Sequence, residues 1–261
     1  MTIKVMTFNV RGSNNDDGVN IWDKRRVLNI ETIQKYAPDL IGFQEVQNGN
    51  RTAYAYTFTD YDTITGFEAW REKGKESNPI YWRRERFNRL DSGAFYLSET
   101  PNQRSVGWDA SLERVATWVK LHDMQTATDF LLLNTHFDHR GEQARTQSAE
   151  LIVRQAHRIA PHMPHIITGD FNALPTDAPH RIYEQAGYSD TYLAAGYTAD
   201  VNTMHRFQGR SFTATAIRID WIFTSGHWHT RACQVILDAD PPLYPSDHYP
   251  VLAELSLTSE Q

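Results

Sequence analysis

Cysteine is nearly absent from this chain: of 261 residues, only Cys233 carries a thiol. A single cysteine excludes an internal disulfide framework and a structural zinc site built from several thiolates. Free cysteine is among the most buried residue types, so we expect Cys233 to be a small core residue and not a nucleophile.

The sequence also lacks long apolar runs and an excess of positive charge. No run approaches the roughly 18 apolar residues of a membrane-spanning helix, and Met1 to Val5 lead into a predicted strand without a signal region. These absences predict a cytoplasmic protein with no membrane span. The formal net charge of −6 argues against coating long nucleic acids by charge, although bound metal ions could reverse the local field in a nuclease.

Apolar residues make up 40% of the chain, which is enough for a sizeable core. Short apolar runs predict strands at 3–9, 40–43, 78–87, 90–96, 115–121, 129–136, 217–224, 233–237 and 251–257. Helical spacing predicts a helix at 23–36, with Val27, Ile30 and Ile33 on its inner face, and a longer helix at 142–159. A shorter helix follows Asp177. With no repeat or linker, we expect one domain over residues 1–261.

The stretch from Ile166 to Asn172 combines a buried strand with chemistry-bearing residues. Ile166 and Ile167 are β-branched, Gly169 allows a sharp turn, and Asp170 and Asn172 follow. On an extended backbone, residues two apart point the same way, so a carboxylate and an amide would meet at a strand end. That pair suits a metal-bound phosphate or an activated water, with an ordinary polar turn as the alternative.

The same pattern recurs along the chain, and we predict that the residues at these strand ends share one site. Glu45 and Asp247 can bind a hard cation such as Mg²⁺, which prefers oxygen ligands. A histidine could ligate zinc or be oriented by a carboxylate, but no zinc-binding spacing occurs. The predicted buried strands end in these residues: Asn9; Glu45; His136; Asp170 with Asn172; Asp220; and Asp247 with His248.

Six motifs in this order resemble those of the endonuclease/exonuclease/phosphatase superfamily. The resemblance covers nearly the whole chain and is strongest to bacterial members of unassigned substrate. It implies an α/β (α+β) fold, a four-layer sandwich of two packed, mostly antiparallel sheets flanked by helices, as in deoxyribonuclease I. The motifs are Thr7-Phe8-Asn9-Val10-Arg11, Gln44-Glu45-Val46, Asn134-Thr135-His136, Gly169-Asp170-Phe171-Asn172, Ile219-Asp220-Trp221-Ile222 and Ser246-Asp247-His248-Tyr249-Pro250-Val251.

The resemblance also implies a metal and phosphate site. Glu45 would be the principal Mg²⁺ ligand, with Asn9 and Asp247 nearby. Glu76 would be an acid paired with a histidine close to the phosphate. Arg114 would contact the phosphate, and a surface salt bridge is the alternative for that residue.

The remaining implied roles concern the reaction itself. Asp170 would orient or deprotonate the attacking water, and Asn172 would hold that water or the phosphate. His248, oriented by Asp220, would donate to the phosphoryl oxygen that gains charge, and His136 would be a second phosphate-facing histidine. These roles agree with what phosphoryl transfer requires, namely a nucleophile in line and positive charge around the phosphoryl oxygens.

We therefore predict a phosphodiester hydrolase, either a phosphodiesterase or a nuclease, that depends on Mg²⁺ or alternatively Mn²⁺. The acidic charge and compact length favour single-stranded nucleic acid or a small phosphodiester, and nothing indicates a protein partner. The alternatives are a phosphomonoesterase for a phosphorylated sugar or inositol, and a non-catalytic binding module. Loop residues could stack on bases or sugars, or pack onto the sandwich: Trp70, Arg71, Trp108, Arg206 and Phe207.

Overall fold

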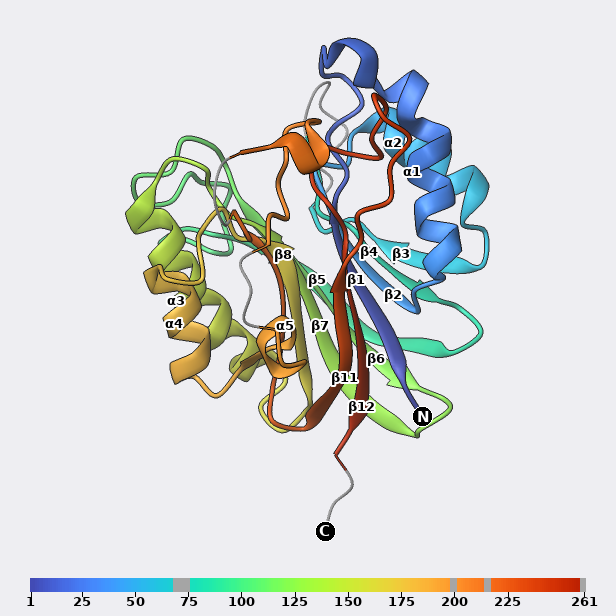
Figure 1. The fold of residues 1–261 in the computed structure, drawn as a ribbon. Helices are drawn as coiled ribbons and strands as arrows, with labels where there is room; N and C mark the ends of the chain where they lie inside the picture. Colours follow the sequence, from blue (N-terminus) through green and yellow to red (C-terminus); the bar gives the residue numbers. More distant parts are fainter. Residues whose placement is uncertain (68–75, 198–200, 214–216, 259–261) are drawn as a thin grey trace.

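A computed structural model describes residues 1–67, 76–197, 201–213 and 217–258. Within these ranges the chain forms two six-stranded sheets packed face to face, with helices on both outer sides (Figure 1). The predicted four-layer sandwich is confirmed. The prediction of one domain over 1–261 stays a prediction. The loop around Trp70 and Arg71 lies outside the described residues.

The first sheet is covered on its outer face by α1 (Trp22–Tyr36) and α2 (Asn48–Thr57). Only its β1–β2 pair is parallel, and its other pairs are antiparallel. In spatial order its strands are β11 (Trp228–Val235), β12 (Val251–Leu257), β1 (Ile3–Asn9), β2 (Leu40–Gln44), β4 (Ile80–Arg83) and β3 (Tyr61–Ile64).

The second sheet is covered by α3 (Glu142–Ile159) and α4 (Ala178–Gln185), while α5 (Thr191–Ala194) lies against β10 and β11. Its β7–β8 pair is parallel because α3 forms the crossover between them. In spatial order its strands are β5 (Phe87–Tyr96), β6 (Val115–Asp123), β7 (Thr128–His136), β8 (His165–Asp170), β10 (Asp220–Thr224) and β9 (Ser189–Asp190).

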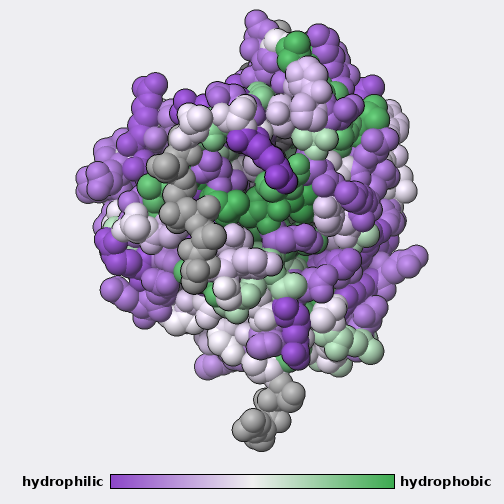
Figure 2. All heavy atoms as spheres, in the orientation of Figure 1, coloured by the Kyte–Doolittle hydropathy of each residue, from purple (hydrophilic) through white to green (hydrophobic). Residues whose placement is uncertain are grey.

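Apolar side chains from both sheets fill the space between them. Val5 and Leu40 of the first sheet belong to the same buried cluster as Phe130, Leu132 and Ile166 of the second. Hydrophilic residues cover most of the face shown in Figure 2, and hydrophobic ones gather in a recess near its centre. The predicted burial of Cys233 is confirmed. Among the described helices, none has the length and apolarity needed to cross a membrane.

The prediction for the inner face of α1 was wrong at Val27, which is 58% exposed. Arg25 and Asn29 are fully buried there beside Ile33, because the backbone of neighbouring loops supplies hydrogen-bond partners for their polar groups. Helix α2 was not predicted, since it begins in the turn-like sequence Asn48-Gly49-Asn50. A reciprocal capping box between Gln47 and Asn50 satisfies its first backbone groups.

The strand ends that carry chemistry lie at one edge of the sandwich. Strands β1, β2, β7 and β8 end there, while the N-terminus lies at the opposite end (Figure 1). The prediction that every site residue ends its strand was wrong at two places. Asp220 begins β10, and Asp247 with His248 precede β12. Strand β10 runs antiparallel to β8, and β12 runs antiparallel to β1. Because β8 and β1 end at this edge, β10 and β12 begin there.

Candidate active site

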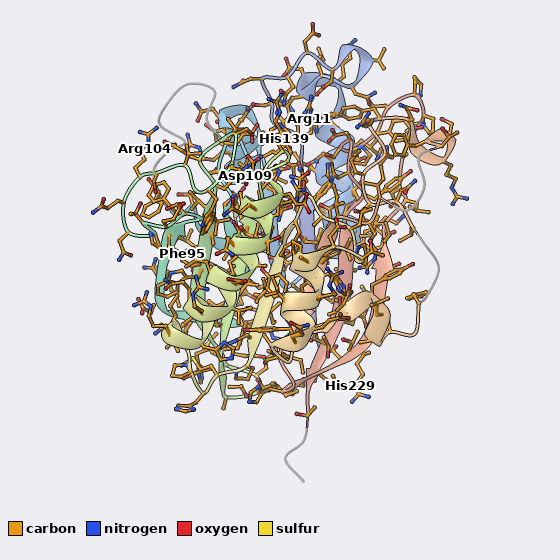
Figure 3. The ribbon with its side chains drawn as sticks, turned by 90° about the vertical axis from the view of Figure 1, so that its left-hand side faces the viewer. Arg11, Phe95, Arg104, Asp109, His139 and His229 are labelled. Atoms are coloured by element: carbon orange, nitrogen blue, oxygen red, sulfur yellow. The ribbon has the colours of Figure 1, made fainter. Side chains whose placement is uncertain are left out.

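A cleft of about 320 Å³ opens at this edge of the sandwich. Arg11 and His139, both in its lining, lie at the loop end of the molecule, and His229 lies at the far end (Figure 3). Two of the ten predicted site residues, Asn9 and Asp220, lie behind this lining and hydrogen-bond to residues within it. Eight of the ten predicted site residues line the cleft: Glu45, Glu76, Arg114, His136, Asp170, Asn172, Asp247 and His248.

Asp220, His248 and Asp170 form a buried acid–histidine–acid arrangement. His248 Nδ1 lies 2.9 Å from Asp220 Oδ2, and its Nε2 lies 3.9 Å from Asp170 Oδ2. Burial alone would lower the pKa of His248, but the charge of Asp220 and their hydrogen bond outweigh it and raise that pKa well above its usual value. His248 is therefore an imidazolium whose Nε2 N–H is available as a donor beside Asp170.

Asp170 is held at the end of β8 by two donors. Asn9 Nδ2 donates to its Oδ2 at 2.9 Å, and the backbone N–H of Asn172 donates to its Oδ1 at 3.0 Å. Burial and the nearby charge of Asp220 raise the pKa of Asp170 to about 7. A carboxylate with such a pKa can take a proton near neutral pH, which suits a general base.

The predicted extended backbone from Asp170 to Asn172 was wrong. Asn172 has φ of +46°, in the left-handed region, so the chain turns and the carboxylate accepts the N–H two residues on. Asparagine tolerates this conformation because its short polar side chain bonds locally. Asp170 and Asn172 still face the same cleft, but through a turn and not through strand alternation.

His136 is neutral and its tautomer follows from its neighbours. Asn172 Nδ2 donates to the Phe137 carbonyl at 3.0 Å, which fixes the orientation of the amide. The same nitrogen lies 3.1 Å from His136 Nε2, which must therefore accept and leave the ring proton on Nδ1. Burial and the charge of Arg114 lower the pKa of His136. Its Nδ1 is buried and has no hydrogen-bond partner in the described part of the chain.

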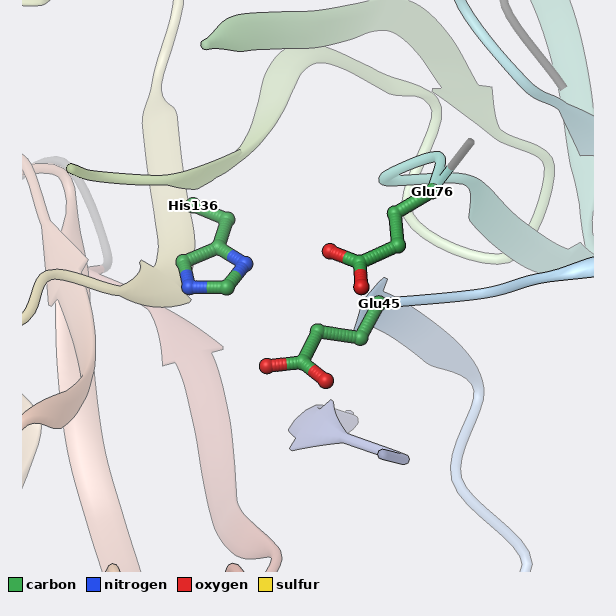
Figure 4. Close-up of side chains that lie close together, drawn as sticks. All are labelled: Glu45, Glu76 and His136. Carbon is green, nitrogen blue, oxygen red and sulfur yellow. The ribbon is translucent and has the colours of Figure 1, made fainter. Parts of the chain in front are cut away.

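Glu45 and Glu76 face that unpartnered nitrogen (Figure 4). One ligand atom from each of Glu45, Glu76 and His136 lies within 4.8 Å of the others. Glu76 is exposed at the cleft mouth, yet loss of hydration around its carboxylate and the charge of Glu45 raise its pKa to about 7. Burial likewise raises the pKa of Asp247, and Glu45 adds to that shift. Three acids thus converge, and among the described residues only Arg11 lies within ion-pair distance of one of them, Asp247.

These residues fit a divalent cation. The donor set is rich in carboxylate oxygens, which Mg²⁺ prefers, and a cation would relieve the repulsion by Glu45 that, together with burial, raises the pKa values of Glu76 and Asp247. Glu45, Glu76 and Asp247 are the residues that could hold it. Arg11 only partly offsets their charge, because its guanidinium bonds Asp17 and its Nε stays 3.9 Å from Asp247 Oδ2.

The role of Asn9 as a metal ligand stays a prediction, and hydrogen bonds fix how its amide is oriented. Its Oδ1 accepts the backbone N–H of Arg11 at 3.1 Å, which fixes the amide orientation. Its Nδ2 consequently faces the site and donates to Glu45 Oε1 at 3.0 Å and to Asp170 Oδ2 at 2.9 Å. Asn9 therefore bridges the two carboxylates and does not turn an oxygen toward them.

Arg114 is held inside the cleft wall, so its predicted alternative as a surface salt bridge was wrong. Its Nε lies 3.7 Å from Asp138 Oδ2, and its Nη2 lies 3.3 Å from His139 Nδ1. Asp138 is buried and accepts the backbone N–H groups of Arg140 and Gly141, which lower its pKa although burial opposes this. Arg114 is thus fixed with its side chain toward the cleft.

The loop residues that could stack on bases or sugars lie in different surroundings. Arg206 lines the cleft, whereas Trp108 packs against the core between the second sheet and α3, and Phe207 lies against Arg25. Stacking on a base or sugar stays a prediction for Arg206. Trp70 and Arg71 lie outside the described residues.

Arg25 and Asn29 of α1 support the site but were not predicted from sequence. Arg25 Nη1 donates to the carbonyls of Val10 and Pro245, at 2.8 and 2.9 Å, and Asn29 Nδ2 donates to Pro245 at 3.0 Å. The two helix residues join the loop after Asn9 to the loop before Asp247. Their spacing of four, continued by Ile33 on the buried face, is the signal that could have indicated them.

A polar layer beneath the cleft also joins the two sheets. Gln44 Nε2 donates to Asn134 Oδ1 at 2.7 Å, and Asn134 Nδ2 donates to the Phe43 carbonyl. Gly42 allows this close approach, because a Cβ there would lie 2.2 Å from Thr168 Oγ1. Both Gln44 and Asn134 belong to the predicted motifs, but only the packing of the sheets gives them a role.

Known proteins resemble this chain along nearly its whole length. The human protein Nocturnin is 24% identical over 99% of this chain, which spans 66% of its length. An endonuclease/exonuclease/phosphatase of Bacteroides vulgatus is 32% identical, with a TM-score of 0.91 over 99% of this chain and all of that one. A mannosyl-6-phosphatase of Bacteroides thetaiotaomicron is 30% identical, with a TM-score of 0.89 over 98% of this chain and all of that one.

The match to a family extends across the site. Residues 6–248 match the model of the Endonuclease/Exonuclease/phosphatase family, and this range includes all ten predicted site residues. The chain therefore belongs to the Endonuclease/Exonuclease/phosphatase family.

Proposed function

We propose that this chain hydrolyses phosphodiesters with the help of Mg²⁺. The observation that carries the proposal is the meeting, in one cleft, of an imidazolium beside an acid of raised pKa and a group of acids that lacks a cation. Phosphoryl transfer needs both, namely a positioned water and positive charge around the phosphoryl oxygens. Single-stranded nucleic acid or a small phosphodiester is the substrate class that the acidic chain favours.

Each of the following residues of the site then has a separate role in the reaction. Asp170 takes the proton of the attacking water, since its pKa lies near neutral pH. His248 donates from Nε2 to the phosphoryl oxygen that gains charge, and Asp220 fixes its ring. Asn172 holds both Asp170 and His136 in place. Held by Glu45, Asp247 and Glu76, a divalent cation would polarise the phosphoryl group.

A second candidate is hydrolysis of a sugar phosphate monoester. The observation that favours it is the similarity, along the full length of both chains, to the mannosyl-6-phosphatase of Bacteroides thetaiotaomicron. The catalytic residues would keep the same tasks. Only the alcohol that leaves and the second ester group would differ.

The test is a panel of phosphomonoesters and phosphodiesters, with single- and double-stranded nucleic acid, measured with Mg²⁺ and with Mn²⁺. We expect diester hydrolysis that EDTA abolishes and that Glu45→Gln largely removes, while Glu150→Gln on the exposed face of α3 keeps it. Hydrolysis of monoesters alone would overturn the diester proposal in favour of the second candidate. Hydrolysis that EDTA leaves unchanged would overturn the need for a metal.

A further inference from the structure

A second cavity, of about 210 Å³, adjoins the catalytic cleft. The two cavities share Glu76, Arg114 and His136 in their walls. A phosphate held in the cleft beside His136 would therefore direct one of its ester groups into this second cavity. The rest of its wall comes mainly from Thr65, Phe67, Asn78, Tyr96, Val115 and Thr117.

The cavity wall carries hydroxyl and amide groups with spare hydrogen-bonding capacity. Thr117 of β6 is fully buried, and its Oγ1 has no hydrogen-bond partner among the described residues. Buried hydroxyls are almost always bonded, so an unpartnered one in a cavity wall can bond a water or a polar group of a ligand. Asn78 Nδ2 donates to the Val115 carbonyl at 3.1 Å, which leaves the amide oxygen as an acceptor.

The charges of the wall select against a second negative group. Among the described residues of this wall, Glu76 contributes a carboxylate, Glu113 is paired with Arg104 at 2.8 Å, and Arg114 is paired with Asp138 at 3.7 Å. Binding the backbone of a nucleic acid requires lysine and arginine at each phosphate. The part of the substrate that enters this cavity is therefore uncharged.

Size and shape narrow the ligand further. Cavities for drug-sized ligands and cofactors measure about 300–1,000 Å³, so 210 Å³ suits a smaller ligand such as a single sugar ring. Phe67 and Tyr96 stack on each other with centroids 4.5 Å apart and planes 13° apart, and they form one apolar wall. A ring with an apolar face and several hydroxyls matches a wall that combines aromatic side chains with threonine and asparagine.

We propose that this cavity binds the sugar ring of a phosphorylated monosaccharide, with Thr117 as a specificity-determining residue. The proposal rests on the proposed phosphoester hydrolysis in the adjoining cleft. The sugar hydroxyls bond Thr117 and Asn78, its ring lies against Phe67 and Tyr96, and its phosphate reaches His136 and Arg114. This holds whether the phosphate carries one ester group or two.

The test compares substrates that differ only in the group entering the cavity, using the whole chain with Mg²⁺. Glucose 6-phosphate and mannose 6-phosphate probe the sugar ring, glycerol 3-phosphate probes a small alcohol, and adenosine 5′-monophosphate probes a nucleoside. We expect a higher kcat/KM for at least one hexose phosphate than for the other two esters. Equal or better hydrolysis of glycerol 3-phosphate or of the nucleotide would overturn the proposal.

Variants of Thr117 test the hydroxyl. Thr117→Val keeps the side-chain size and removes one hydrogen bond, so we expect about a tenfold loss of kcat/KM for the hexose phosphate, mainly through KM. Hydrolysis of glycerol 3-phosphate should not change, and Thr117→Ser should restore the hexose phosphate rate. Thr224→Val is the matched control, because Thr224 is equally buried, has an unpartnered Oγ1 and lies on β10 away from the cavity.

The outcomes separate this proposal from the proposed function. An equal loss on both substrates, or the same loss in Thr224→Val, would show that Thr117 acts through the fold and not through the sugar. If none of these monoesters is hydrolysed, the phosphodiester panel decides the proposed function separately. Calorimetric binding of a hexose phosphate, lost in Thr117→Val and kept in Thr117→Ser, would then still support the sugar site, and its absence would overturn it.

Discussion

The two sides of the cleft reach their charge balance in different ways. On one side, Asp170, Asp220 and His248 are all buried, and a 2.9 Å hydrogen bond pairs the imidazolium with an acid. On the other side, Glu45 and Glu76 are more exposed, His136 is neutral, and its Nδ1 has no partner among the described residues. The described residues complete the first side by themselves, whereas the second side could hold a divalent cation.

This difference follows from the chemistry of desolvation. A buried charge is tolerated only when an opposite charge and hydrogen bonds replace water. His248 meets that condition between two carboxylates, so its side of the cleft is preorganised. Glu45, Glu76 and Asp247 do not meet it, and they lie at a cleft mouth where water or a metal ion can enter. The comparison predicts that the two sides respond differently to mutation and to metal.

The largest effect is expected from breaking the preorganised side. His248→Ala removes the proton donor, and we expect a loss of kcat of about a thousandfold, in the range that general acid catalysis contributes. Asp220→Asn should lose a similar factor, because the ring loses the partner that keeps it charged. Mg²⁺ affinity should change little in either variant, measured by titration of the rate with Mg²⁺. Full activity in His248→Ala would contradict this side of the comparison.

The next largest effect is expected from Arg25, which joins the loop after Asn9 to the loop before Asp247. Arg25→Met leaves the carbonyls of Val10 and Pro245 without donors, and we expect unfolding to become easier by about 3 kcal/mol. Because the loops of Asn9 and Asp247 would also separate, the Mg²⁺ concentration for half-maximal rate should rise. Urea unfolding and a Mg²⁺ titration measure the two effects.

The exposed neighbour Arg26 provides the control for this experiment. Arg26→Met should leave both stability and Mg²⁺ dependence unchanged, since surface substitutions rarely exceed about 0.5 kcal/mol. An equal response of the two arginine variants would show that the buried clamp does not connect the loops.

The metal-dependent side is tested by ligand stabilisation. At a Mg²⁺ concentration 100-fold above Kd, binding should stabilise the fold by about 2.7 kcal/mol, seen as a higher Tm. Glu45→Gln should abolish most of this gain. Without Mg²⁺ it should be no less stable than the wild type, because one of three repelling acids is gone. An identical Mg²⁺ response in both proteins would place the cation elsewhere.

The smallest effect concerns the acid that holds Arg114. Hydrogen bonds lower the pKa of Asp138 in the folded protein, so its stabilisation is present above the unfolded value of about 3.9 and is lost as pH falls below it. We expect Asp138→Asn to cost about 2 kcal/mol at pH 7 and the difference from wild type to shrink below pH 4. Asp62→Asn, which breaks an exposed ion pair with Arg84, is the control and should show neither change.

Sequence reasoning located the members of the site but misjudged how several of them are held. Asp170 and Asn172 were expected to share a strand face, yet a left-handed residue brings them together. Asn9 was expected near the metal, and the structure shows in addition that its Nδ2 joins Glu45 to Asp170. Val27 was expected inside α1, yet Arg25 takes the buried face, because its donors find carbonyls on loops that the sequence pattern does not show.

The sequence by itself determined most of the strands, though not β3 or β9, together with the long helix α3 and the set of polar residues at one edge of the sandwich, because these depend on local periodicity and on the identity of neighbours in the chain. Tertiary structure decided which acids are paired and which are left without a cation. The bond from Asn9 to Asp170 spans 161 positions and that from Arg25 to Pro245 spans 220. Contacts over such distances exist only once two sheets and a helix have packed, since nothing in the neighbouring residues fixes where they meet.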